Sequence, residues 1–218
     1  KVTLKGDVVK EFEKGITAYE VAKEISMGLA KQACAVRING ENKDLRTALL
    51  EDCALEILTF EDDYGKWTFR HTASHIMAQA VKRLFPKALV TIGPAVDDGF
   101  YYDFDVENSF TPDDLKKIEE EMKKIVKEDI KIERFTMPRD EAIAYFKEKN
   151  EPYKVELVES IEEGEEISFY SQGDFTDLCA GAHLMSTGAV KAFKLTSATG
   201  AYWRGNSDNK MLCRVYGT

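Results

Sequence analysis

The stretch WTFRHTASHIMAQAVKRLFP, residues 67–86, decides how the chain is organised, because it predicts one long helix that ends at a proline. Its apolar residues cover one broad arc of a helical wheel: Ala73, Ile76, Met77, Ala80, Val81 and Leu84. His71 and His75 point nearly opposite the centre of that arc. We therefore expect this helix to pack its apolar side on a core and to present both imidazoles to a cleft or to solvent.

The 3 histidines of the chain fall into two spaced pairs. His71 and His75 are four residues apart in HTASH, and Cys179 and His183 are four residues apart in CAGAH. A lone pair on an amphipathic helix is usually a surface feature, so the second pair is what favours a site. Four such donors can bind Zn²⁺ tetrahedrally. Mostly neutral imidazoles could equally hold a polar substrate and a water by hydrogen bonds, and the spacing leaves both interpretations open.

Further polar residues lie near the second pair in the sequence. Tyr170 and Asp177 precede it, and Lys154 lies upstream in EPYKVE. The remaining cysteines stand in apolar strand or turn patterns, so we expect them to be buried packing residues: Cys34, Cys53 and Cys213.

Outward from the long helix, the pattern after residue 86 mixes strands and helices. Strand-like stretches at 88–93 and 99–105 flank the turn-rich PAVDDG. Thr111-Pro112 opens a helix with Thr as its cap, and a shorter helix follows Pro138. From Lys154 onward the pattern predicts mostly strands, at 154–158, 167–172, 190–197, 201–204 and 211–216.

Residues 1–60 predict a small unit of their own. A strand hairpin surrounds KGD, and the helix at 17–33 opens with the capping-box pair Thr17 and Glu20. A strand runs into the turn Asn39-Gly40, LRTALL (45–50) predicts a short helix, and a closing strand follows at 54–60. EDDYGK (61–66) is typical of a linker. This order predicts a compact sheet with a helix packed across it.

Composition limits the class of protein. The chain has 218 residues, 44% of them hydrophobic, with 30 Lys+Arg against 39 Asp+Glu and a formal net charge of −9. No apolar run approaches the roughly 18–20 residues of a membrane span, and no signal peptide opens the chain. With 4 cysteines, a disulfide framework is not expected, so we predict a cytoplasmic protein with reduced thiols.

The acidic balance argues only against a uniform basic surface. The stretch after CAGAH is locally basic, which is compatible with local binding of a nucleic acid: Lys191, Lys194, Arg204, Lys210 and Arg214.

Several stretches resemble the N-terminal region of bacterial threonyl-tRNA synthetases. They are GPAVDDGFYYDFD (93–105), DLCAGAH (177–183) and AYWRGNSDNKMLCRVYGT (201–218), together with HTASH, and residues 1–60 resemble the TGS-type β-grasp module that opens those enzymes. The resemblance implies an α+β chain. A small ubiquitin-like β-grasp domain (1–61) would be followed by a larger α/β editing domain (62–218) of the threonyl/alanyl-tRNA synthetase type.

In that family, the second domain hydrolyses the ester of serine wrongly loaded on threonine tRNA, releasing serine and free tRNA. Threonine exceeds serine by one methyl group, worth only about 1–3 kcal/mol in a pocket, so activation alone cannot reject serine. The parent enzyme would ligate threonine to its tRNA with ATP and form a homodimer through its synthetase core. No motif of that core appears, so we expect a fragment, or a separate editing protein, that does not itself charge tRNA. The expected partners are the acceptor end of tRNA(Thr) carrying serine and the remainder of the synthetase, with no membrane.

The resemblance carries over a set of pocket residues by position: His71, His75, Lys154, Asp177, Cys179 and His183. It implies that Asp177 anchors the substrate amino group, that Lys154 holds a water or the ribose, and that His71 positions the attacking water. Tyr102 and Tyr170 match wall positions that would stack on the adenine or the ribose. An aminoacyl ester is already activated, so no covalent nucleophile is required.

Alanyl-tRNA synthetases have a similar editing fold with zinc on the matching His/His/Cys/His set. In the threonyl family these positions generally work without an obligatory metal, so we expect no cofactor for editing. If a metal binds, its ligands would be His71, His75, Cys179 and His183, while ATP and a further zinc belong to the absent core. The family often reads CRGPH where this chain has Ala180 and Ala182, which predicts weaker contact with tRNA.

Two alternatives to a deacylase stay open. One is a non-catalytic, zinc-stabilised tRNA-binding module that positions a partner synthetase. The other is a metallohydrolase of unrelated substrate.

Overall fold

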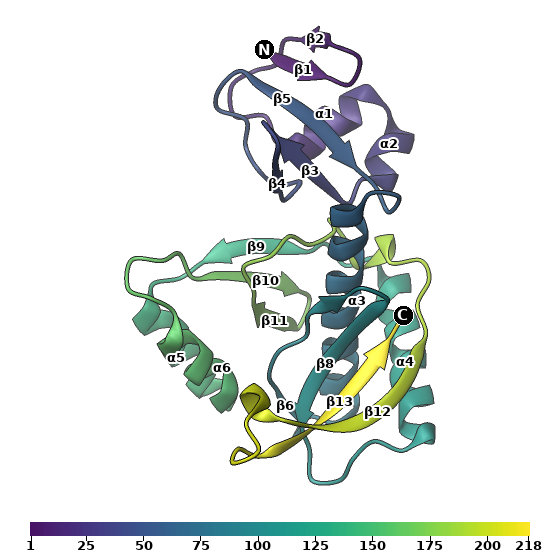
Figure 1. The fold of residues 1–218 in the computed structure, drawn as a ribbon, viewed down its shortest axis with the longest axis vertical. Helices are drawn as coiled ribbons and strands as arrows, with labels where there is room; N and C mark the ends of the chain where they lie inside the picture. The colour runs from purple at the N-terminus through teal and green to yellow at the C-terminus, as the bar shows by residue number, and fades with distance from the viewer. The chain divides into compact units, whose positions relative to one another are not determined.

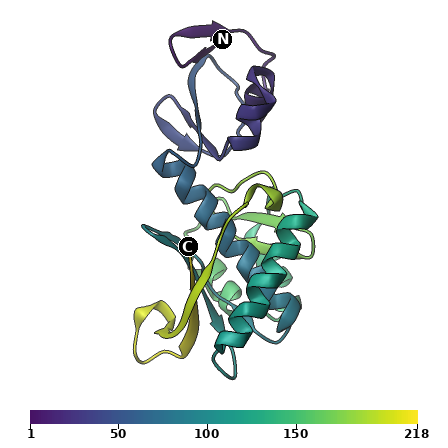
Figure 2. The same cartoon turned by 90° about the vertical axis from the view of Figure 1, so that its right-hand side faces the viewer.

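A computed structural model describes all residues, 1–218, as two compact units (Figures 1 and 2). The first comprises Lys1–Phe69 and Gly181–Met185, and the second comprises Arg70–Ala180 and Ser186–Thr218. None of its helices is long and apolar enough to span a bilayer.

The first unit is built on a mixed five-stranded sheet in the order β2-β1-β5-β3-β4. Strand β1 pairs antiparallel with β2 and parallel with β5, and buried residues of helix α1 join the sheet in one apolar core. This is the expected β-grasp arrangement. The elements are β1 (Val2–Leu4), β2 (Val8–Lys10), α1 (Ala18–Ile25), α2 (Met27–Gln32), β3 (Ala35–Ile38), β4 (Glu41–Lys43) and β5 (Cys53–Leu58).

Three predictions for this part of the chain were wrong in detail. The helix expected at 17–33 is divided at Ser26, which is extended, ends α1, and caps α2 by accepting a hydrogen bond from the Leu29 N–H. LRTALL is not helical, because Asp44 and Thr47 bond to the local backbone and favour a turn. EDDYGK is not a linker, since helix α3 begins at Asp63.

The second unit contains most of α3 (Asp63–Leu84) and two sheets. Strands β12-β13-β8-β6 form one sheet, with β7 added to β8, and β11-β10-β9 form the other. The strands are β6 (Leu89–Val90), β7 (Ala95–Val96), β8 (Gly99–Asp105), β9 (Glu133–Thr136), β10 (Ser168–Gln172), β11 (Phe175–Leu178), β12 (Leu195–Tyr202) and β13 (Met211–Gly217). Separate helices and sheets confirm the expected α+β class.

The helices of this unit pack on the sheets and on α3. Helix α4 (Pro112–Glu128) has Thr111 as its cap, as the Thr-Pro pair predicts, and the cap is part of a complete capping box in which Thr111 and Asp114 each bond the other's backbone N–H. Helices α5 (Arg139–Glu148) and α6 (Pro152–Ser160) share an apolar cluster with β10. Figure 2 shows α4 alongside α3, to which it is tied by the Arg83–Glu128 ion pair.

Three strand predictions in this unit were wrong, wholly or in part. Residues 154–158 are helical, because Pro152 occupies the first turn of α6, where a proline favours a helix start. The strand expected at 190–197 begins only at Leu195, and the residues expected as a strand at 201–204 end β12 and enter a 3₁₀ turn at Trp203.

Candidate functional site

Both histidines of α3 are buried. His71 is 8% and His75 is 3% exposed, and their rings meet edge to face with centroids 4.9 Å apart. The Nε2 atom of His71 lies 3.5 Å from Sγ of Cys179, the residue that follows β11. The polar face of α3 is thus turned into the protein rather than toward bulk solvent.

Asp177 lies at the centre of the polar cluster. Its Oδ2 accepts a hydrogen bond of 2.8 Å from the Tyr102 hydroxyl and lies 3.5 Å from Nε2 of His75. Nζ of Lys154 lies 2.5 Å from Oδ1, and both side chains of this ion pair are almost fully buried. A carboxylate oxygen has more than one acceptor position, so Oδ1 keeps capacity to accept a further hydrogen bond beside Lys154.

Separate elements bring these groups together. Lys154 is in the first turn of α6, and the start of that helix is fixed by Glu151, which pairs with Lys82 at 2.7 Å and accepts from the Val90 N–H at 3.1 Å. Asp177 stands on β11 directly opposite Tyr170 of β10. The charged groups are therefore held by secondary structure and not by loose loops.

The ring of Tyr102 fits against the backbone at Gly93. A Cβ at that glycine would fall 2.0 Å from Cδ2 of the ring, so only glycine allows this approach. The Gly93 carbonyl also accepts a hydrogen bond of 2.7 Å from the Ser74 hydroxyl of α3. Both contacts favour the orientation in which the Tyr102 hydroxyl meets Asp177.

Burial and charge set the protonation of the cluster. Burial lowers the pKa of His75 to about 4, outweighing the opposite effect of Asp177, so its imidazole is neutral near pH 7. Burial alone would raise the pKa of the Asp177 carboxyl, but its polar neighbours, Lys154 first, bring it below the usual value. Burial raises the pKa of Tyr102 well above its ordinary value, so the phenol stays a donor. A carboxylate is thus kept ionised inside the protein.

Tyr170 and His183 are both buried. Tyr170 is buried in a small cluster with Ile132 and Cys179. His183 is fully buried and belongs to the segment Gly181–Met185 of the first unit.

Within the first unit, two residues hold the backbone around His183. Arg46 donates to the carbonyls of His183 and Leu184 at 2.9 and 2.7 Å, and the His183 N–H donates to Asp44 at 3.1 Å. The substrate-binding roles of Tyr102 and Tyr170, and the catalytic role of His183, stay predictions.

The donor set suits a soft or borderline metal. His71, His75 and Cys179 each offer one ligand atom, and these atoms lie within 4.8 Å of one another. Nitrogen and thiolate ligands in a tetrahedral zinc site are roughly 3.3–3.8 Å apart, and the His71–Cys179 separation of 3.5 Å falls in that range. A carboxylate beside a ligating imidazole, as Asp177 is beside His75, is a common second partner in zinc sites. The residues therefore fit zinc, and His183 is the fourth ligand that the sequence predicts.

All four cysteines are free thiols. Cys34 and Cys213 are buried, as expected, whereas Cys53 is only partly buried.

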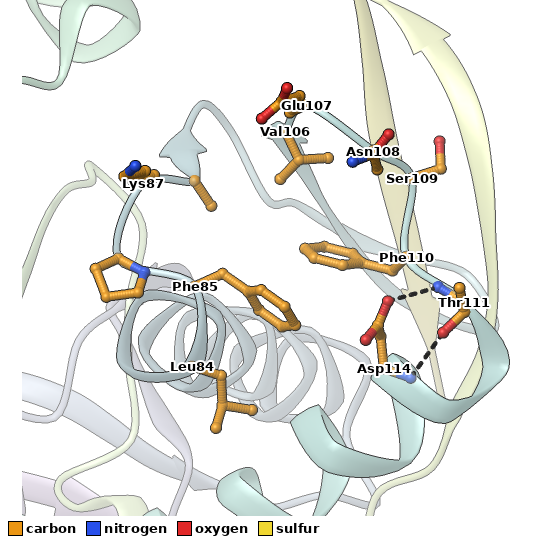
Figure 3. A pocket seen from close by; sticks show the side chains of 12 residues that line it. Leu84, Phe85, Lys87, Val106, Glu107, Asn108, Ser109, Phe110, Thr111 and Asp114 are labelled. Carbon is orange, nitrogen blue, oxygen red and sulfur yellow. Dashed lines mark hydrogen bonds between the residues drawn. The ribbon is translucent and has the colours of Figure 1, made fainter.

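A cavity of about 670 Å³ lies elsewhere in the second unit (Figure 3). It is lined by the end of α3, the loop after β8 and the start of α4. The ring centroids of Phe85 and Phe110, on its wall, lie 5.0 Å apart. None of the site residues predicted from the sequence lines it.

Sequence reasoning missed two features of the cluster. It assigned Tyr102 to a substrate wall and did not foresee its hydrogen bond to Asp177, because nothing in the sequence pairs residues 75 positions apart. It also passed over Gln79, although this residue continues the four-residue spacing of His71 and His75 along α3. That spacing is a signal that could have been read.

Comparisons with known proteins agree with this architecture. Residues 1–59 match the TGS domain family, and residues 167–216 match the family described as threonyl and alanyl tRNA synthetase second additional domain. Over all 218 residues the chain is 63% identical to the threonine–tRNA ligase of Acetivibrio thermocellus and 62% identical to that of Clostridium botulinum. It spans 34% of the length of each relative.

These matches confirm the resemblance that the sequence motifs carry. A β-grasp sheet stands where the first family matches, and β10 to β13 stand where the second matches. The chain therefore contains a TGS domain followed by a threonyl and alanyl tRNA synthetase second additional domain, and over its whole length it is similar to the N-terminal region of bacterial threonine–tRNA ligases.

Proposed function

We propose that this chain is the editing part of a threonine–tRNA ligase and hydrolyses the ester that joins serine to tRNA(Thr). The observation that carries the proposal is the buried Lys154–Asp177 pair, with the Tyr102 hydroxyl and the His75 imidazole on the second carboxylate oxygen. Burying two charges costs desolvation free energy, so a protein that keeps such a pair needs close pairing of the charges or a functional use for them. Such a cluster is typical of a reaction site.

The cluster supplies the groups that ester hydrolysis needs. The free acceptor capacity of Asp177 Oδ1 suits the ammonium of an aminoacyl group. His71 would orient a water whose oxygen attacks the ester carbonyl carbon. The bond from that carbon to the ribose oxygen then breaks, and a proton passes to the ribose oxygen, so serine and tRNA leave. Lys154, beside Asp177, would stabilise charge on the reacting oxygens.

Zinc would alter this chemistry only by adding a Lewis acid. If it binds, His71, His75 and Cys179 would hold it, with His183 as the predicted fourth ligand. We propose that hydrolysis does not require it, because Asp177, Lys154 and the neutral His75 already provide charge stabilisation and proton acceptors.

The remaining assignments rest on the relatives. We propose that a longer protein containing this chain ligates threonine to tRNA(Thr) with ATP in the cytoplasm, as a homodimer. Within this chain, residues 1–61 would be the TGS-type domain and residues 62–218 the editing domain. The partner of the cluster would be the acceptor end of seryl-tRNA(Thr).

The test is hydrolysis of tRNA(Thr) charged with radiolabelled serine or threonine. We expect rapid loss of the seryl ester and slow loss of the threonyl ester. Asp177→Asn and His71→Ala should each lower kcat/KM for the seryl ester by roughly 100-fold or more. Asp140→Asn, at an exposed position on α5, is the matched control and should leave it unchanged.

The outcomes separate the alternatives. No hydrolysis of either ester, combined with tight tRNA binding that a chelator abolishes, would replace the proposal with a zinc-stabilised tRNA-binding module. Unchanged hydrolysis in both site variants would place the reaction elsewhere in the chain. Chelator-sensitive hydrolysis of other esters, with both aminoacyl-tRNAs intact, would indicate an unrelated metallohydrolase.

A further inference from the structure

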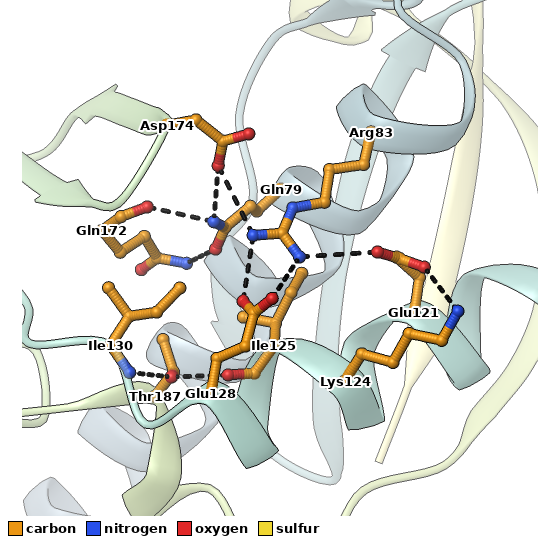
Figure 4. Close-up of polar contacts among 10 residues, drawn as sticks. All are labelled: Gln79, Arg83, Glu121, Lys124, Ile125, Glu128, Ile130, Gln172, Asp174 and Thr187. Atoms are coloured by element: carbon orange, nitrogen blue, oxygen red, sulfur yellow. Dashed lines mark hydrogen bonds and ion pairs between the residues drawn. The ribbon is translucent and has the colours of Figure 1, made fainter.

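The polar stripe of α3 continues past the histidines. Gln79 and Arg83 follow His75 at intervals of four residues, so they lie on the same face of the helix. The Gln79 side chain is 1% exposed, which is unusual for a glutamine, and it meets the β10–β11 hairpin (Figure 4).

Two glutamines bond each other at the turn of this hairpin. Gln172 donates its side-chain N–H to Oε1 of Gln79 at 2.7 Å, and the Gln79 side chain donates to the backbone carbonyl of Gln172 at 3.0 Å. Gln79 also donates to Asp174 at 3.0 Å, and Arg83 lies 3.6 Å from the same carboxylate oxygen. Arg83 is itself held by Glu128 of α4 at 3.0 Å. Figure 4 shows these side chains converging from α3, α4 and the hairpin turn.

The strand that carries Asp177 needs such support. β11 has only four residues and pairs with β10 alone, so it is the edge of its sheet. The hairpin register is short and fixed, with Gln172 opposite Phe175 and Tyr170 opposite Asp177. Because side chains alternate along a strand, a slip of one residue would turn Asp177 away from α3. Contacts at the turn therefore determine where its carboxylate meets the helix.

We propose that Gln79 and Gln172 are positioning residues, whose two hydrogen bonds to each other hold β11 in register along α3 so that Asp177 meets His75 and Lys154. The hydrogen bonds of the two glutamines join them to each other and to Asp174, and not to the Lys154–Asp177 ion pair. Asp174 and Arg83 support the pair at the exposed end of the hairpin. The kinetic consequence rests on the proposed hydrolysis, whereas the structural consequence does not.

The kinetic test uses Gln79→Met and Gln172→Met, which keep the volume of each side chain but remove its hydrogen bonds. Each should lower kcat for seryl-tRNA(Thr) about 10- to 100-fold with KM changed less than about twofold, because a small misplacement of reacting groups lowers the rate steeply. The double variant should be no slower than the worse single variant, since both substitutions break the same Gln79–Gln172 interaction. Gln32→Met, at an exposed glutamine of α2, is the matched control.

The structural test is hydrogen–deuterium exchange of the same variants. We expect faster exchange confined to the hairpin amides at 168–178, with unchanged exchange in β12 and β13. Exchange that speeds up everywhere would mean a general loss of stability, and would overturn the positioning role. The positioning role would also be overturned if Gln79→Met and Gln172→Met had the same hairpin exchange and the same kcat as Gln32→Met.

The two tests separate failure of this inference from failure of the proposed function. If the unaltered chain hydrolyses no ester, the proposed function fails and the exchange measurement alone decides the positioning role. If the methionine variants do not fold, Asp174→Asn replaces them, because its side chain is 66% exposed. Asp174→Asn should also speed up hairpin exchange, by a smaller factor. Unchanged hairpin exchange in this variant would contradict the inference.

Discussion

The Lys154 ammonium and the Asp177 carboxylate form an ion pair at 2.5 Å in which neither side chain exposes more than 2% of its surface. Each charge is stable at its position only because the other is present. Removing one partner of a buried pair typically destabilises a protein by about 3–5 kcal/mol, whereas an exposed pair contributes about 0–1 kcal/mol. The stability lost on removing one partner therefore shows whether the pair is buried.

Lys154→Met should therefore lower the free energy of unfolding by about 3–5 kcal/mol, because Asp177 would be left buried and uncompensated. Urea denaturation at pH 7 measures the change. Lys131→Met is the matched control, since Lys131 is paired only at 3.8 Å in an exposed contact, and it should change stability by less than about 0.5 kcal/mol. Equal effects of the two substitutions would argue against a buried pair.

The stability of the protein should decrease in mild acid because of His75. Its pKa is about 4 in the folded chain and 6.5 when unperturbed, so between these values the unfolded chain binds more protons. The contribution of neutral His75 is complete above pH 6.5 and is lost as the pH falls toward 4, by roughly 3 kcal/mol in all. Urea denaturation from pH 7 to pH 4 should show this decrease in the unaltered chain and a shallower one in His75→Gln. Equal dependence of stability on pH in the two proteins would contradict a lowered pKa of His75.

Gly93→Ala should disturb the cluster from outside it. The new Cβ would fall 2.0 Å from the Tyr102 ring, which would have to move away from Asp177. We expect a loss of about 1–3 kcal/mol of stability and slower ester hydrolysis. Gly28→Ala is the control, because its Cβ would meet nothing closer than 3.9 Å and alanine favours a helix. Thermal unfolding of the two variants should move in opposite directions, and a neutral Gly93→Ala would show that the ring has room.

Metal removal should leave hydrolysis unchanged. His71, His75 and Cys179 offer donors that fit zinc, but the proposed reaction uses the charge of Lys154 and Asp177 instead. Dialysis against a chelator, checked by elemental analysis, followed by the seryl-tRNA(Thr) assay measures this. A rate that falls with the metal content and returns with added zinc would make the metal part of the reaction.

Local signals in the sequence predicted the elements that depend on neighbouring residues. Thr111 and Asp114 form their capping box because both partners lie within one turn of helix. The prediction of secondary structure failed where contacts between distant residues, or the chemistry of a turn, determine the backbone conformation. Residues 154–158 alternate like a strand, yet Pro152 and the anchored Glu151 start a helix there. Its first turn places Lys154 beside Asp177.

The members of the polar cluster were also easier to predict than its geometry. Spacing and resemblance selected His75, Lys154 and Asp177, which the structure brings together. No local pattern could show that Tyr102 donates to Asp177, or that Gln79 meets Gln172, because these contacts join residues 75 and 93 positions apart. Such pairings exist only after the sheets have packed on α3.

The same separations have a consequence for synthesis on the ribosome. Tyr102 is made 75 residues before Asp177, and His71 is made 108 residues before Cys179. Contacts between such distant residues require the closure of long loops, which slows folding. A growing chain that has not yet reached Asp177 carries Lys154 without the carboxylate that neutralises it. The cluster is therefore completed only when the strand β11 emerges and joins a helix made long before.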